Sequence, residues 1–102
     1  MLELRPICEN CAKNLPPDSL DARICSFECT FCAACVADLL HNVCPNCGGA
    51  FTARPIRPSR NWKGDNFLGK YPPGTTPRHR PVDAPAHHLF ADPIEALRPD
   101  QR

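Results

Sequence analysis

The sequence predicts a small α+β domain that needs bound metal for its stability, followed by an extended, proline-rich tail. All eight cysteines lie between Cys8 and Cys47. Nine of the thirteen prolines follow residue 53, and each removes a backbone donor and fixes φ, so long regular elements are not expected there. Residues 1–57 are too few for apolar burial alone to offset the entropy of ordering them. We therefore expect a metal-binding domain over 1–57 and a largely irregular or disordered tail over 58–102.

The spacing of the cysteines is typical of zinc ligands. Three pairs are separated by two residues and one pair by three. A closed structural zinc site takes four ligands in a tetrahedron, and a Cys-x-x-Cys turn places two sulfurs on one ion. Eight cysteines therefore predict two zinc ions, and each contributes roughly 10–16 kcal/mol to folding. The pairs are Cys8/Cys11, Cys25/Cys29, Cys32/Cys35 and Cys44/Cys47.

Two ways of sharing these pairs between the ions are open. In the sequential arrangement the first four cysteines bind one ion and the last four bind the other. In the interleaved arrangement the pairs alternate between the ions along the chain. Site 1 would then consist of Cys8, Cys11, Cys32 and Cys35, and site 2 of Cys25, Cys29, Cys44 and Cys47.

Local patterns predict a short hairpin and one short helix among the ligands. Residues 23–31 alternate and are rich in Ile and Phe, which favours a hairpin that carries Cys25 and Cys29. Apolar residues after Cys35 recur at i, i+3, i+4 and i+7, which predicts a helix with one apolar face. That face consists of Val36, Leu39, Leu40 and Val43.

The order of pair, long loop, tight quartet, helix and final pair resembles the cross-brace of RING fingers, a treble-clef-like arrangement. The resemblance extends to Pro45 in the last pair. It implies the interleaved arrangement, with Cys8 and Cys35 around one ion and Cys25 and Cys47 around the other. We therefore favour interleaved over sequential pairing.

Over residues 1–58 the chain more closely resembles a small bacterial family, domain of unknown function 1272. The resemblance implies a bacterial origin and zinc binding, and it implies no activity. The tail lies outside it. The motifs that carry it are Met-Leu-Glu-Leu-Arg-Pro at 1–6, Leu-Pro-Pro-Asp-Ser at 15–19, Ile-Cys-Ser-Phe-Glu-Cys-Thr-Phe-Cys at 24–32, Cys-Pro-Asn-Cys-Gly-Gly at 44–49 and Arg-Pro-Ile-Arg-Pro at 54–58.

No catalytic set is expected in this chain. A zinc ion saturated by four thiolates cannot activate water. Ubiquitin-ligase activity is not expected either, because Asn10 replaces the aliphatic residue and Gly48 the basic residue that flank RING ligands. We expect His41 to be a surface residue of the helix rather than a ligand. The remaining histidines are expected to be solvated, and they are His79, His87 and His88.

Charge and composition separate the tail from the cysteine-bearing part. Residues 1–53 carry three basic and six acidic groups, whereas residues 54–102 carry nine basic and five acidic groups. Residues 61–71 interleave aromatic and basic side chains, as in single-strand nucleic-acid binders, but docking of these aromatics on the core is favoured. Residues 89–98 predict a helix of one or two turns, with Asp92 as its cap and Pro93 at its first position.

These observations predict a non-enzymatic structural zinc module that presents an interaction surface to another macromolecule, first of all a protein. One alternative is a nucleic-acid binder that uses the tail, and another is a thiol-based redox or zinc sensor. Glu3 and Pro6 interrupt the apolar run of a signal peptide, and no segment is long enough to span a membrane. A cytoplasmic location without a membrane partner is expected, and the oligomeric state is left open.

Overall fold

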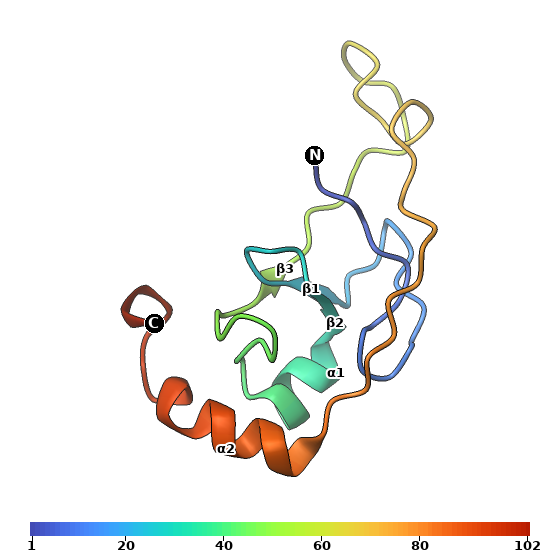
Figure 1. The fold of residues 1–102 in the computed structure, drawn as a ribbon. Helices are drawn as coiled ribbons and strands as arrows, with labels where there is room; N and C mark the ends of the chain where they lie inside the picture. Colours follow the sequence, from blue (N-terminus) through green and yellow to red (C-terminus); the bar gives the residue numbers. More distant parts are fainter.

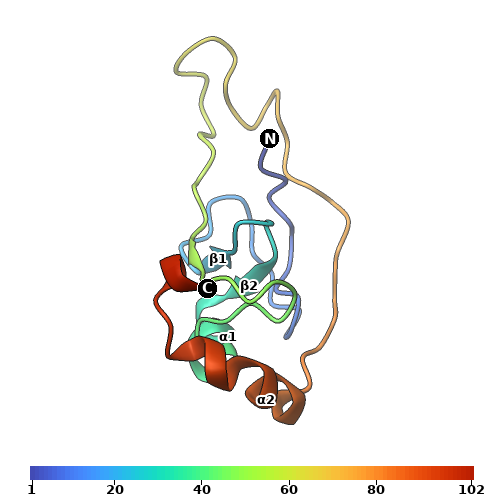
Figure 2. The same ribbon diagram turned by 60° about the vertical axis from the view of Figure 1, so that its left-hand side comes forward.

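The computed structural model describes residues 1–102, which form a cysteine-bearing half and a long returning tail. The chain leaves the cysteine-bearing half after residue 53, loops out at one end of the molecule and returns as a helix across the other end (Figures 1 and 2). The molecule measures 46 × 27 × 18 Å. None of its helices has the length and hydrophobicity needed to cross a membrane.

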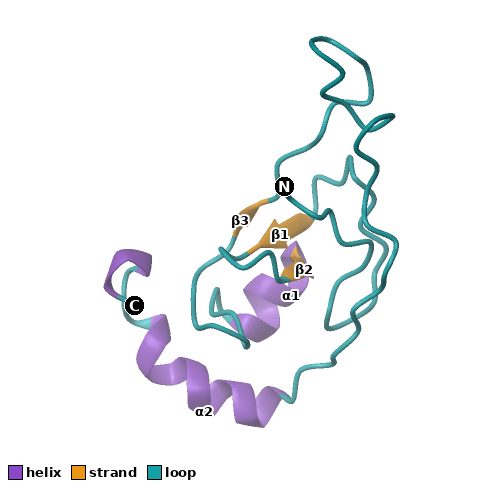
Figure 3. Cartoon of the chain, turned by 45° about the horizontal axis from the view of Figure 1, so that its top comes forward, coloured by secondary structure: helices purple, strands orange, loops and turns teal.

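A three-stranded antiparallel sheet lies at the centre of the cysteine-bearing half, in the order β2-β1-β3 (Figure 3). The predicted hairpin is present: β1 (Ala22–Ile24) pairs with β2 (Thr30–Cys32), with Arg23 opposite Phe31. Glu28 adopts a φ of 66° in the connecting turn, which brings the chain back into β2. The strand β3 (Thr52–Ala53) pairs with the other edge of β1 and was not predicted.

A short helix follows β2 directly. It comprises α1 (Ala33–Cys35) and the π-helical turn η1 (Val36–Leu40). The predicted apolar face is only partly correct, because the helix stops before Val43. Val36 and Leu40 are buried on the helix, whereas Val43 enters the core from the turn that follows. His41 lies just past the helix end in a left-handed conformation, with a φ of 51°.

The apolar core and the cysteines occupy the same region. Five of the eleven residues in the buried cluster are cysteines. Phe31 and Phe51 meet there edge to face, with their ring centroids 5.5 Å apart. Little apolar packing therefore remains apart from the sulfur atoms, which agrees with a fold that depends on metal.

The tail contains a longer helix than the sequence predicted. Helix α2 (Ala84–Glu95) starts at a cap formed by Asp83, whose carboxylate accepts a hydrogen bond from the Ala86 amide at 3.2 Å. The predicted start at Asp92 and Pro93 was wrong, because Pro93 lies inside α2 near its end. The helix packs against η1 and buries His87 and Ala91. A 3-10 turn, η2 (Pro99–Gln101), follows.

The segment from residue 72 to residue 82 has no regular secondary structure, but it is fixed to the N-terminal segment. The Gly74 amide donates to the Glu3 carbonyl at 2.9 Å, and the Arg80 amide donates to the Glu9 carbonyl at 2.7 Å. Figure 1 shows the two segments side by side. This segment is thus irregular, as expected for the tail, and backbone hydrogen bonds to distant residues hold it.

Residues 58–71 form a loop that closes on itself away from the core (yellow in Figure 1). The Leu68 amide donates to the Pro58 carbonyl at 2.9 Å. Trp62 is 74% exposed, so the prediction that the aromatic residues of this segment dock on the core was wrong for it. Phe67 and Tyr71 are half-buried within the loop and around its base, and do not belong to the core cluster.

Candidate metal centre

Four cysteine sulfurs gather at one point in the first group. The Sγ atoms of Cys8, Cys11, Cys32 and Cys35 all lie within 4.8 Å of one another. The Sγ atoms of Cys11 and Cys32 are 3.8 Å apart. Zinc–sulfur bonds of about 2.3 Å in a tetrahedron place the ligand sulfurs about 3.8 Å apart, so Cys11 and Cys32 already have this spacing and the group could hold a metal ion. The grouping is interleaved, because Cys11 lies beside Cys32 and not beside Cys25.

Local backbone structure positions these four sulfurs. The loop with Cys8 and Cys11 is closed by a bridge between Ile7 and Asn14. Cys32 is the last residue of β2 and Cys35 the last of α1, so one strand–helix junction supplies the second pair. Asn10 Nδ2 donates to Cys35 Sγ at 3.2 Å. A donor aimed at a ligand sulfur stabilises the thiolate form that binds metal.

The second group brings together the sulfurs of Cys25, Cys44 and Cys47, which all lie within 4.8 Å of one another. A backbone amide two residues further along the chain donates to each sulfur at 3.4 Å. These amides belong to Phe27, Asn46 and Gly49. Such N–H···S bonds are the usual support of cysteine ligands, so this group could also hold a metal ion.

Cys29, the predicted fourth member of site 2, is not within the same distance of all three sulfurs. It is buried at the end of the hairpin turn, where its carbonyl accepts a hydrogen bond from the Cys25 amide at 3.2 Å. Burial raises the pKa of the Cys29 thiol, and the nearby Asn46 side chain opposes that rise. The structure thus places Cys29 beside the group, next to Cys25 and Asn46, but brings only three predicted ligands together.

The pKa values of the thiols differ with their burial and their hydrogen bonds. Burial raises the pKa of the Cys32, Cys35 and Cys44 thiols. Burial also acts to raise the pKa of Cys11, but hydrogen bonds, first from the backbone of Lys13, outweigh it and leave that pKa below its usual value. Since a metal ligand must be a thiolate, metal binding at these buried thiols has to displace protons.

Comparison with known proteins places this arrangement in a family. Residues 1–57 match the model of DUF1272, which is described as a protein of unknown function. The chain belongs to the DUF1272 family. An uncharacterized protein of Rhizobium meliloti strain 1021 is 55% identical over 75 residues, which cover 74% of this chain and 82% of that protein. Since 75 residues do not fit within 57, this similarity continues into the tail. No solved structure matches the chain significantly.

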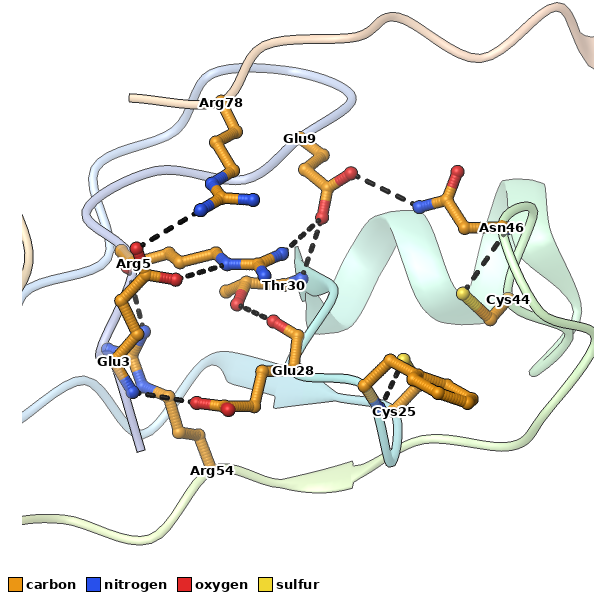
Figure 4. A network of polar contacts seen from close by, with 11 residues as sticks. Glu3, Arg5, Glu9, Cys25, Glu28, Thr30, Cys44, Asn46, Arg54 and Arg78 are labelled. Carbon is orange, nitrogen blue, oxygen red and sulfur yellow. Dashed lines mark hydrogen bonds and ion pairs between the residues drawn. The ribbon is translucent and has the colours of Figure 1, made fainter. Parts of the chain in front are cut away.

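A buried carboxylate of this DUF1272 chain was not predicted from the sequence; Figure 4 shows it among Arg5, Thr30 and Asn46. Glu9, which follows Cys8, is only 4% exposed. Its Oε2 accepts hydrogen bonds from the Thr30 amide at 3.0 Å and from Arg5 Nη1 at 3.4 Å. Its Oε1 accepts from Asn46 Nδ2 at 3.3 Å. Glu9 therefore joins the Cys8/Cys11 turn to β2 and to the Cys44/Cys47 turn. Its position between two predicted ligands was the only feature of the sequence that could have pointed to this role.

A buried arginine was missed as well. Arg54 is 4% exposed and has no carboxylate partner. Its guanidinium donates to the carbonyl oxygens of Arg5 at 2.8 Å, Leu15 at 3.1 Å and Pro16 at 2.9 Å. Burial lowers the pKa of Arg54. These bonds fix the loop that follows the Cys8/Cys11 turn, so the role of Arg54 is structural.

No histidine of the DUF1272 chain joins either cysteine group. His87 was expected to be solvated but is 4% exposed, and its Nε2 lies 3.0 Å from the Leu40 carbonyl. His79 Nε2 lies 3.1 Å from the Asn10 carbonyl. His41 and His88 pack with ring centroids 5.3 Å apart. Three of these histidines, His79, His87 and His88, thus fix the tail on the cysteine-bearing half.

Proposed function

We propose that this DUF1272 protein is a structural zinc module that carries two zinc ions and acts by binding another protein, without catalysis. Its architecture would be a RING-like cross-brace. The observation that carries the proposal is the group of four cysteine sulfurs that all lie within 4.8 Å of one another, as the ligands of one metal ion would. The first ion would bind Cys8, Cys11, Cys32 and Cys35, and the second Cys25, Cys29, Cys44 and Cys47.

The chemistry of the donors supports zinc over other occupants. All eight cysteines are free thiols, so no disulfide competes for the ligands. Thiolate sulfurs favour zinc over magnesium or calcium, which prefer oxygen ligands. Four thiolates leave no open position for water or a substrate, so such an ion stabilises the fold and does not take part in a reaction.

A hollow beside the hairpin, lined by apolar and polar residues in about equal measure, supports a protein-binding surface. It has a volume of about 560 Å³, and its lining includes Met1, Leu2, Ile24 and Ala50. Met1 is 83% exposed, and Phe27, in the adjoining turn, is 69% exposed. Exposed apolar side chains around a hollow are typical of surfaces that bind other proteins.

Two measurements test this proposal. Native mass spectrometry of protein purified without added zinc should give two zinc ions per chain. Affinity capture from native cells should then compare the full chain with Phe27→Glu and with a control, Leu89→Glu, which changes an equally apolar residue that is 82% exposed on α2. We expect one captured protein to be lost only with Phe27→Glu while both variants keep two ions. Fewer than two ions, or the same captured proteins for both variants, would contradict the proposal.

A further inference from the structure

The loop of residues 58–71, here called the basic loop, carries a second binding surface. We propose that the basic loop binds single-stranded nucleic acid. In this complex the Trp62 indole stacks on a base, and Arg60, Lys63 and Lys70 contact phosphates. None of these four residues lines the hollow beside the hairpin or belongs to a cysteine group.

The first argument is that the basic loop is preformed. Arg57 closes its base by donating to the Tyr71 carbonyl at 2.8 Å and to the Leu2 carbonyl at 2.7 Å. Inside the loop, Asn61 Nδ2 donates to Asp65 Oδ1 at 2.8 Å, and the Asp65 amide donates back to Asn61 Oδ1 at 3.0 Å. A loop ordered before binding loses less entropy when a ligand arrives, and closed surface loops of this length are frequently functional.

The second argument is that the Trp62 side chain does not contribute to the packed core. Its side chain is 74% exposed, whereas Phe67 and Tyr71 lie beside Met1 and Arg57 at the base of the loop. The ordered backbone therefore presents a large aromatic face to solvent. Stacking of a base on such a face contributes about 1–3 kcal/mol, and it tolerates any base because each has a π-face.

The third argument is charge. None of Arg60, Lys63 and Lys70 takes part in an ion pair. The carboxylate of Asp65, the one acidic residue of the loop, accepts one hydrogen bond, from Asn61 Nδ2. The basic loop therefore presents a net positive charge beside the exposed indole, and a phosphate backbone complements this charge.

The charge of the rest of the chain favours a single strand over a duplex. Residues 1–53 hold six acidic and three basic groups, and thiolate-bound zinc would add further negative charge. A rigid duplex on the loop would bring additional phosphates against this acidic half, where like charges repel. A flexible single strand can bind the loop alone.

The test uses the only tryptophan of the protein as the reporter. Full-length, zinc-loaded protein is titrated with an oligothymidylate of about 12 nucleotides while Trp62 fluorescence is followed. We expect saturable quenching, and three phosphate contacts predict a slope of log K against log salt of about −2. Lys63→Gln should reduce that slope by about 0.7. The control, Arg98→Gln, removes an exposed cation from the other end of the tail and should leave the slope unchanged.

A second measurement separates stacking from charge. With a labelled oligothymidylate, anisotropy should show that Trp62→Ala binds about 5- to 150-fold more weakly, while its zinc content and circular dichroism stay those of the parent. No quenching at low salt, or equal effects of Lys63→Gln and Arg98→Gln, would overturn the proposal. It would also be overturned if Trp62 fluorescence shifted with vesicles of anionic phosphatidylglycerol but not with the oligonucleotide, because the loop would then bind membranes.

Discussion

At the scale of single residues, the two cysteine groups depend on polar side chains between them. The Glu9 carboxylate accepts hydrogen bonds from β2 and from the Cys44/Cys47 turn, and Arg5 is its charged partner. Asn10 donates to Cys35 Sγ, and its Oδ1 accepts a hydrogen bond from the Val82 amide at 2.9 Å. Asn10, one of the two residues that depart from the RING pattern, therefore links the first cysteine group to the tail. Spacing alone could not predict these roles, because the partners other than Arg5 lie more than 20 residues away in the sequence.

Replacing Glu9 by Gln should lower the free energy of unfolding by about 1–3 kcal/mol, because one buried acceptor becomes a donor and Arg5 loses one of its two carboxylate partners, keeping only Glu3. Urea unfolding of the zinc-loaded protein measures this change. Asp38→Asn, on the exposed side of the short helix, is the control and should stay within about 0.5 kcal/mol. Equal stability of the two variants would show that Glu9 is not structurally important.

Replacing Cys29 by Ser tests the fourth ligand of site 2. We expect one of the two zinc ions to be lost to a chelator at lower concentration, because a neutral hydroxyl is a much poorer zinc ligand than a thiolate. Competition with a colorimetric chelator measures the release of both ions. Ser26→Ala, in the same turn, should not change it. Unchanged release from Cys29→Ser would mean that three cysteines hold the second ion.

At the scale of secondary-structure elements, the sequence predicted the elements that local patterns determine and missed those that depend on distant contacts. The hairpin was predicted because alternation over residues 23–31 is a local signal. The strand β3 was not, because its two residues are exposed and are ordered only by pairing with β1. Start signals for α2 occur at both Asp83 and Asp92. The burial of Ala91 against η1 favours the first start, and local sequence does not show that contact.

Replacing Ala91 by Glu should detach α2, because this side chain is 1% exposed and a buried, unpaired carboxylate is strongly unfavourable. Hydrogen exchange over residues 84–95 should become at least about tenfold faster, while the zinc content stays at two. Ala96→Glu, at the exposed end of the same helix, should leave exchange in this segment nearly unchanged. Slow exchange in the Ala91 variant would contradict the packing described for α2.

At the scale of the whole molecule, the number of ligand pairs could be predicted from spacing, whereas their interleaved grouping was predicted only through the resemblance to the RING cross-brace. Both arrangements keep every Cys-x-x-Cys pair intact. What separates them is that β2, which ends at Cys32, lies beside the Cys8 loop, where the Glu9 amide donates to the Thr30 carbonyl at 3.0 Å. Such contacts depend on the topology of the chain. The structure of the tail was harder to predict, because the tail is ordered by its contacts with the cysteine-bearing half.

Removal of zinc should unfold the cysteine-bearing half and release α2 at the same time, because the helix packs on η1, which follows a ligand pair directly. A strong chelator should abolish both the circular-dichroism signal and the amide dispersion of residues 1–57 and 84–95. Adding zinc back under reducing conditions should restore them. Native dispersion in the metal-free protein would show that apolar packing is sufficient for the fold.

The proximity of Cys11 and Cys32 bears on the folding pathway. In an unfolded chain, the Cys8/Cys11 and Cys25/Cys29 pairs are separated by a shorter loop than Cys8/Cys11 and Cys32/Cys35, and shorter loops close at a lower entropic cost. That difference is small, since doubling a loop costs only about 0.6 kcal/mol. Zinc added to unfolded protein should therefore capture misassigned pairs in part of the population. Refolding should slow as zinc rises above two ions per chain, because these species must release metal before the native pairs form.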